Sequence, residues 1–299
     1  MNTEASHKLV AWKRLFGTII LVVSAVCTTV IAAPDAAHAQ RMPPQPSWAT
    51  GESDPEDLNV YLVTFGIGDR IVEWFGHSAL VIEDTETGDD RLYNYGMFSF
   101  SSTMLVKFAM GRLWFWVGQS DPERTYQFYK GLGRDVRILE LNLPPDKRME
   151  MAEFLAEDVL PENRDYLYHH YNDNCSTRIR DVVDDAVDGR LQEISSEPSD
   201  LTLRDHTRIH SAQNPPMEML LMFMMNDNID QPITHWDEMF LPKHLETWVK
   251  RLEYEAPGGE MRKLAGEERI YYDSGRRDRP EEPPVHWPVA LLLGLLVGA

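Results

Sequence analysis

The spacing of apolar residues along the chain predicts strands and helices in alternation from about residue 58 onward. Runs rich in β-branched and aromatic residues, separated by turns of glycine and acidic residues, are typical of antiparallel strands. The runs lie at 59–65, 72–82, 91–98, 113–117 and 136–142. Helical spacing, with proline near the start and glycine or proline near the end, is typical of helices. Such segments lie at 101–110, 121–131 and from 144 to just before Pro161.

The clearest helix start in the chain is at Asn174. Three residues with side chains that favour the N-cap position, Asn172, Asp173 and Asn174, precede a stretch whose apolar residues recur every three to four positions. This pattern places Cys175 in the first turn of an amphipathic helix. The pattern remains helical, and rich in methionine, to about Tyr254. The sequence therefore predicts an α+β domain with a helical C-terminal extension.

The two ends of the chain have a different character. Residues 1–39 have basic residues followed by an apolar run and then a small-residue exit, which indicates a signal peptide or an uncleaved anchor. Residues 40–57 are interpreted as a linker, 58–255 as the folded domain and 256–284 as a second linker. Residues 285–299 are apolar and resemble the start of a transmembrane helix. The domain is thus expected on the outer side of a membrane, in the cell envelope.

Charge and cysteine content narrow the possible functions. The formal net charge is −19, so no basic nucleic-acid-binding face is expected and any membrane contact must be apolar or tethered. The chain has two cysteines, and Cys27 lies within the apolar run of the signal. Cys175 is then the one cysteine of the folded part, so an intramolecular disulfide is not expected. A lone exported thiol favours a catalytic role.

Cys175 is the candidate nucleophile, and His77 is the candidate base. The helix start, together with Arg178 one turn further on, is expected to favour the thiolate. Gly76 precedes His77 on a predicted strand, and a glycine there leaves room for close approach of another backbone or a substrate. The alternatives are a buried structural cysteine and a hydrogen-bonded core histidine.

The remaining members of the site come from neighbouring positions. Asn94 on the next strand is the candidate to orient the imidazole, with Tyr93 or Tyr95 as alternatives on the opposite face. The start of the cysteine helix, with Asn174 and Ser176, is the candidate oxyanion site. If these residues form a catalytic site, the imidazole and the thiol are expected within roughly 3–4.5 Å.

Other candidate sites are weaker. His206 and His210 are four residues apart on a predicted helix, but position 207 is Thr where the metalloprotease pattern needs Glu, so no metal site is predicted. No cofactor is expected. The apolar segment 215–225 (PPMEMLLMFMM) is interpreted as core, with a wall for an acyl chain as the alternative.

Several sequence blocks resemble one known family. In order they are TFGIGD, WFGHSALVI, YNYGMFSF, FAMGRLWFWV, YHHYNDNCSTRIRD and DQPITHWDEMFLP, spanning roughly Val60 to Leu252. The chain resembles the N-terminal periplasmic domain of Lnb-type lipoprotein N-acyltransferases. This resemblance implies a permuted papain-like (NlpC-type) fold, with His77 as base and Cys175 as nucleophile of an acyl-thioester mechanism. Domains of this type can precede transmembrane helices.

The sequence therefore leads to the hypothesis of a membrane-tethered thiol acyltransferase. A membrane phospholipid or another lipidated donor would supply the acyl chain, and the N-terminus of a lipoprotein would accept it. Two alternatives remain. The first is a cell-wall amidase or peptidase that uses the same two residues with water as acceptor, and the second is a non-catalytic binding module.

Overall fold

The computed structural model describes residues 44–98, 113–256 and 258–285, together with residues 288, 291, 292, 294 and 295. The chain divides into two compact units, 1–44 and 45–299, and the fold described below belongs to the second. Its strands are β1 (Leu58–Phe65), β2 (His77–Asp84), β3 (Asp90–Met97), β4 (Trp114–Ser120), β5 (Val136–Leu141), β6 (Asp165–Leu167), β7 (Glu253–Glu255), β8 (Met261–Lys263) and β9 (Ala265–Tyr272). Its α-helices are α2 (Ser47–Thr50), α4 (Pro122–Gly131), α5 (Pro145–Asp158), α6 (Cys175–Ala186), α7 (Arg190–Ile194), α8 (Leu203–Ser211), α9 (Pro215–Met224), α10 (His235–Glu238) and α11 (Pro242–Arg251). Short 3₁₀ helices are η1 (Pro55–Asp57), η2 (Ile71–Glu73) and η3 (Asp227–Asp230).

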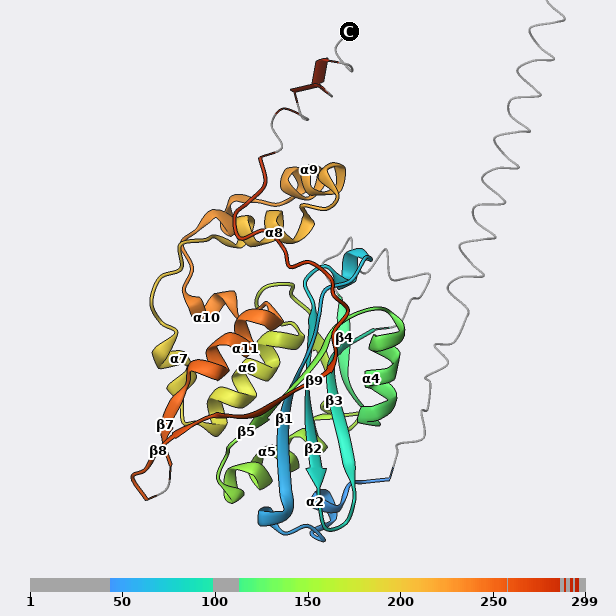
Figure 1. The fold of residues 1–299 in the computed structure, drawn as a ribbon, viewed down its shortest axis with the longest axis vertical. Coiled ribbons are helices and arrows are strands. Elements are labelled where there is room, and N and C mark those ends of the chain that lie inside the picture. Colours follow the sequence, from blue (N-terminus) through green and yellow to red (C-terminus); the bar gives the residue numbers. More distant parts are fainter. Residues whose placement is uncertain are drawn as a thin grey trace, which may run out of the picture. The chain divides into compact units, whose positions relative to one another are not determined.

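A seven-stranded sheet with the order β6-β4-β3-β2-β1-β5-β9 forms the centre of the fold (Figure 1). Each pairing within it is antiparallel. The central strand β1 is buried on both faces, because helices pack against each side of the sheet. The structure therefore confirms an α+β domain built on an antiparallel sheet.

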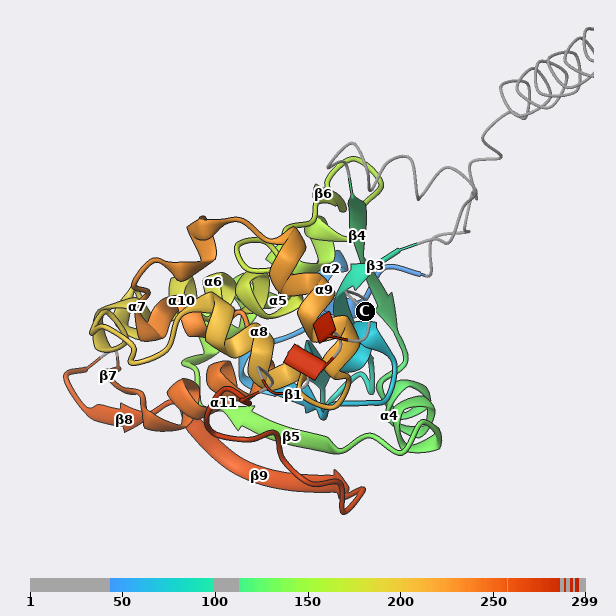
Figure 2. The ribbon, with the colours of Figure 1, turned by 90° about the horizontal axis from the view of Figure 1, so that it is seen from above.

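Two hydrophobic clusters lie on opposite faces of this sheet, as strand alternation requires. Val60 and Leu62 of β1 face the larger cluster, into which α5, α6 and α11 pack. Val63 and Phe65 face a smaller cluster that contains Tyr129 of α4. Figure 2 shows α6 and α5 on one side of the sheet and α4 on the other. The cysteine helix thus packs directly on the central strands.

Most of the predicted elements are confirmed within a few residues. The exception among the central strands is 72–82, where the strand begins only at His77 and η2 occupies its expected first part. Gly76 explains the late start. Its φ is +82°, and a Cβ at this position would lie 3.1 Å from the carbonyl oxygen of Phe65. The close backbone approach expected at this glycine is therefore present, and it bends the chain into β2. The helix predicted at 101–110 lies outside the described residues.

The segment 256–284, expected to be a linker, contains two strands. Within it, β8 pairs with β7, and β9 pairs with β5 at the edge of the main sheet. The sequence of β9, AGEERIYY, has a run of charged residues before Ile270 and the two tyrosines and lacks the alternation that indicates a strand. The predicted transmembrane start at residue 285 stays a prediction. Within the described residues, none of the helices has the length and apolar character needed to span a bilayer.

Candidate active site

Cys175 occupies the first position of α6 because the Asn174 side chain caps the helix. The Asn174 Oδ1 atom accepts hydrogen bonds from the backbone N–H groups of Ser176 (2.8 Å) and Thr177 (2.9 Å). In return, the Thr177 hydroxyl accepts a hydrogen bond from the Asn174 N–H at 2.8 Å. This reciprocal capping defines where the helix begins. It holds the cysteine at the positive end of the helix, as the sequence predicted.

His77 and Asn94 are joined by a short hydrogen bond on adjacent strands. The distance between His77 Nε2 and Asn94 Oδ1 is 2.7 Å. The two candidate tyrosines contact other groups, since Tyr95 donates to Asp158 at 2.6 Å and the Tyr93 hydroxyl accepts from the indole N–H of Trp48 at 3.2 Å. Asn94 is therefore the side chain that orients this imidazole. The bond uses Nε2 and leaves Nδ1 on the other side of the ring.

Gly96 brings the cysteine and the histidine to one place. A Cβ built at Gly96 would lie 3.7 Å from the Cβ of Cys175, 3.8 Å from the Cε1 of His77 and 3.9 Å from the hydroxyl of Tyr166. The φ of Gly96 is +91°, a value that favours glycine. Two residues almost a hundred positions apart in the chain thus both lie beside one glycine of β3. Both side chains remain partly accessible.

Burial gives this pair a neutral resting state. It raises the pKa of the Cys175 thiol above the usual cysteine value, although the backbone N–H groups of Ser78 and Ser176 oppose the shift. Burial also lowers the pKa of His77 to about 4. The positive charge of Arg134 adds to this effect, and the hydrogen bond that His77 donates to Asn94 opposes it. The expectation that the helix start favours the thiolate is therefore reversed, because desolvation outweighs the N–H groups.

Arg134 is a member of this site that the sequence did not reveal. Its guanidinium is buried, lies 4.7 Å from the centre of the Tyr129 ring and donates from Nε to the Gly66 carbonyl at 2.7 Å. Its positive charge acts on both Cys175 and His77. Its Nη2 atom has no hydrogen-bond partner within the described residues. The residue follows a helix-closing turn, where a charged side chain is usually solvent-exposed, so no local pattern indicated its burial.

A family model, the Lnb N-terminal periplasmic domain, matches residues 44–208, which is more than half of the chain. The chain belongs to this family. The domain is periplasmic by the description of its family. A comparison with curated proteins gave no match, and neither did one with solved structures. The matched range contains Cys175, His77 and Asn94 and ends within α8.

In this Lnb domain, Arg178 has a different role from the one predicted. It forms an ion pair with Asp173, with 2.6 Å between Arg178 Nε and Asp173 Oδ1. Its guanidinium lies 4.0 Å from the centre of the Tyr166 ring. The carboxylate of Asp173 offsets its charge, so Arg178 braces the loop that precedes Cys175. The positive charge that acts on the thiol is that of Arg134.

The two candidate oxyanion residues of the Lnb domain, Asn174 and Ser176, use their side chains in hydrogen bonds to the backbone. Both amide hydrogens of Asn174 are donated to backbone carbonyls, at 2.7 and 2.9 Å. The Ser176 hydroxyl is buried and donates to the Met239 carbonyl at 2.7 Å. These side chains fix the start of α6. An oxyanion must therefore rely on backbone N–H groups at this helix end.

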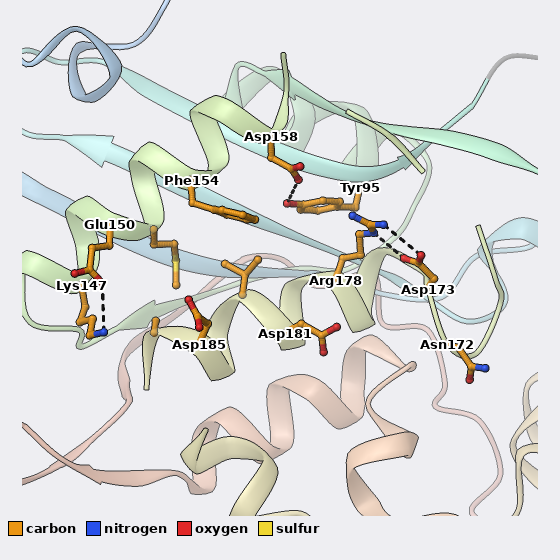
Figure 3. A pocket seen from close by; sticks show the side chains of 13 residues that line it. Tyr95, Lys147, Glu150, Phe154, Asp158, Asn172, Asp173, Arg178, Asp181 and Asp185 are labelled. Carbon is orange, nitrogen blue, oxygen red and sulfur yellow. Dashed lines mark hydrogen bonds and ion pairs between the residues drawn. The ribbon is translucent and has the colours of Figure 1, made fainter. Parts of the chain in front are cut away.

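Two cavities flank the site without including Cys175 in their linings. The first, about 500 Å³, lies between α5 and α6 (Figure 3). Its acidic lining is Glu150, Asp158, Asp173, Asp181 and Asp185, and its two cations are ion-paired. The second, about 270 Å³, is lined by Phe65 and Gly76 next to His77 and by three arginines of the C-terminal segment, Arg276, Arg277 and Arg279. The first cavity is thus mainly acidic, whereas the second has charges of both signs, because Asp135, Asp278 and Glu281 also line it.

The histidines considered for a metal site make protein hydrogen bonds instead. His206 Nε2 lies 2.9 Å from Glu238 Oε1, and His210 Nδ1 donates to the His206 carbonyl at 2.9 Å. His235 contacts the other oxygen of Glu238 at 2.7 Å. Among the described residues, no group of three or more His, Cys, Asp or Glu side chains is placed to hold a metal ion.

Proposed function

We propose that this chain is a periplasm-facing cysteine acyltransferase that carries an acyl group on Cys175. The observation that supports this most is that Cys175 and His77 both lie beside Gly96, with Asn94 bonded to the Nε2 atom of the ring. Thiol acyl transfer needs a nucleophile, a base and a group that orients the base. Here these would be a cysteine at a helix start, a histidine on a strand and an amide on the next strand. Membership of the Lnb family supports the same reaction class. We also infer that the fold is a permuted papain-like one, because its strand-borne histidine precedes its helix-borne cysteine.

The first half-reaction transfers an acyl group from an ester to sulfur. The sulfur of Cys175 attacks the carbonyl carbon of a phospholipid ester while the Nδ1 atom of His77 takes the thiol proton. The carbon–oxygen bond then breaks, and His77 returns the proton to the departing alcohol oxygen. The products are a thioester on Cys175 and a lysophospholipid. The low pKa of His77 suits this second transfer, because an imidazolium with a low pKa is a strong acid.

The second half-reaction regenerates the enzyme. The neutral amine at the N-terminus of a lipoprotein attacks the thioester carbonyl, and His77 takes a proton from the nitrogen. The carbon–sulfur bond breaks, and Cys175 regains its proton from His77. The product is an amide. Asn94 keeps the imidazole oriented in both steps, since a ring fixed at Nε2 presents Nδ1 to the reacting groups.

The charges near the pair support an anionic transition state. The backbone N–H groups of Ser78, Ser176 and Cys175 lower the pKa of the thiol, which means that they are oriented to stabilise negative charge there. Arg134 adds a buried positive charge. These groups offset only part of the rise in the Cys175 pKa that burial causes. The thiol therefore loses its proton during the attack and not before it.

The arginines that line the cavity next to Gly76 support a phospholipid as donor. Arg276 pairs with Asp69, but two nitrogens of Arg279, Nε and Nη2, have no partner within the described residues. Such donors are complementary to the phosphate of a phospholipid headgroup.

The test is intact-mass measurement of the purified chain after incubation with a defined diacyl phospholipid. The expected result is an added mass of one acyl group on Cys175 that is absent in Cys175→Ala and strongly reduced in His77→Ala. The matched control is His235→Ala, a histidine bonded to Glu238 outside the site. Addition of a peptide amine should then release an amide product. Free fatty acid as the sole product would indicate a hydrolase, and no adduct from any ester donor would refute the proposal.

A further inference from the structure

Helix α9 is strongly apolar and yet poorly buried. Its sequence is PPMEMLLMFM, and Glu218 is its one buried residue. The side chains of Leu220, Phe223 and Met224 are 49%, 88% and 66% exposed. A helix that is apolar on all sides is normally buried in a protein core or a membrane. The prediction that this segment belongs to the core is therefore wrong, and the exposed face needs another partner.

The single charge of α9 is turned away from the exposed face. Arg208 of α8 contacts Glu218 at 3.1 Å, and this carboxylate is buried against the helix pair. Two further contacts hold the helix end. The Tyr171 hydroxyl lies 3.6 Å from the sulfur of Met225, and Arg204 donates to the Met222 carbonyl at 3.4 Å. The polar groups of α9 thus anchor it to the domain, and what it presents outward is hydrocarbon and one aromatic ring.

The helix pair α8–α9 lies at the same end of the domain as the candidate site. Tyr171, four residues before Cys175, bonds Thr207 of α8 at 2.7 Å. Phe75, two residues before His77, packs against His170 of the loop before α6 and against His210 of α8. The distances between ring centres are 4.4 and 5.2 Å. Figure 1 shows α8 and α9 beyond the end of the sheet at which β2 begins. A surface bound by α9 would therefore lie close to the two reacting side chains.

The C-terminal segment adds a second exposed apolar group beside this pair. Arg208, which holds Glu218, also donates to the carbonyl of Pro284. The chain after Pro284 exposes Val285, Leu291, Leu292 and Leu295. Two apolar segments thus leave the domain next to each other. A planar apolar phase would bury the exposed groups of both segments together.

We propose that α9 inserts into the interfacial region of a lipid bilayer and holds the candidate site at the membrane surface. Phe223 and its neighbours enter the boundary between headgroups and acyl chains. The acidic domain repels anionic headgroups, so contact with zwitterionic lipid is favoured. This inference does not depend on the acyl-transfer chemistry.

The experiment combines vesicle flotation with local hydrogen exchange, using the full chain and phosphatidylcholine vesicles. The expected result is slower amide exchange at 217–225 when vesicles are present. Phe223→Asp should lower the vesicle-bound fraction about tenfold or more and abolish that protection. The matched control is Phe128→Asp on α4, where the ring is 62% exposed on the other face of the sheet. This variant should bind like the parent chain. Both replacements are at exposed positions, so melting temperatures should stay close to that of the parent.

Each other outcome overturns the proposal. If the chain floats with vesicles while exchange at 217–225 is unchanged, the C-terminal segment alone binds lipid. If protection of 217–225 rises with protein concentration in the absence of lipid, a second copy covers the helix. If 217–225 is already protected in the dilute, lipid-free chain, another segment of the same chain covers it. A failure of any of these kinds leaves the cysteine chemistry unaffected, because that is measured by the acyl adduct on Cys175.

Discussion

Replacing Gly96 with alanine tests whether Cys175 and His77 act on each other. The added methyl group would lie 3.7 Å from the Cys175 Cβ and 3.8 Å from the His77 Cε1. These are ordinary van der Waals contacts, so the methyl group fits without a clash but occupies the space that a substrate carbonyl would need. A positive φ of +91° adds a backbone cost of about 1–2 kcal/mol for alanine.

Gly88→Ala is the matched control for this substitution. Gly88 also has a positive φ, +74°, but nothing lies within 4 Å of its Cβ position. Both variants should therefore lose about 1–2 kcal/mol of unfolding free energy in urea. Only Gly96→Ala should lose the acyl adduct on Cys175, by about a hundredfold in rate, because the methyl group would move a bound substrate by about 1 Å and a misplacement of that size has such an effect.

The assay is the rate of adduct formation by intact mass, measured alongside urea unfolding of the same samples. A normal rate in Gly96→Ala, at the expected loss of stability, would refute the view that the two side chains react across this glycine. Equal rate losses in both glycine variants would show that destabilisation alone explains the effect.

Two further predictions follow from the contacts and pKa shifts of the site. Asn94→Ala removes the hydrogen bond to Nε2 of His77 and should slow adduct formation by about 10- to 100-fold. The control is Asn163→Ala, at an exposed loop amide, which should leave the rate unchanged. An unchanged rate in Asn94→Ala would exclude an orienting role for Asn94. Burial lowers the pKa of His77 and His170 to about 4 and that of His210 to about 3, so from pH 6.5 down to about 4 the unfolded chain binds more protons than the folded one. The free energy of unfolding should therefore decrease as pH falls through this range, by up to about 1.4 kcal/mol per pH unit for each histidine. In urea titrations at several pH values, His210→Gln should reduce the dependence of the unfolding free energy on pH. An unfolding free energy that does not change with pH would contradict the burial of these rings.

The local pattern of the sequence was enough for the elements that carry the site. The start of α6 depends on hydrogen bonds between Asn174 and residues two and three positions later, so the position of Cys175 in its first turn is encoded within one short segment. The strands around His77 and Asn94 follow from their runs of β-branched and aromatic residues. The late start of β2 does not, because Gly76 is bent by a backbone contact with Phe65, eleven positions earlier in the chain.

Side-chain environment, in contrast, was decided by the tertiary structure. Strand alternation left Asn94 and the two tyrosines as partners for His77, and only distant contacts with Trp48 and Asp158 removed the tyrosines.

The protonation state of Cys175 depends on desolvation by segments that pack around it, and no pattern within α6 encodes that burial. The same holds for Arg134, whose charge acts on Cys175 from a turn 41 positions earlier in the chain.

The apolar composition of α9 was visible in the sequence, but whether protein or another phase covers an apolar helix depends on what packs against it. The spacing of apolar residues determines which side chains share one face of a helix. Tertiary packing determines whether that face lies against protein or is exposed.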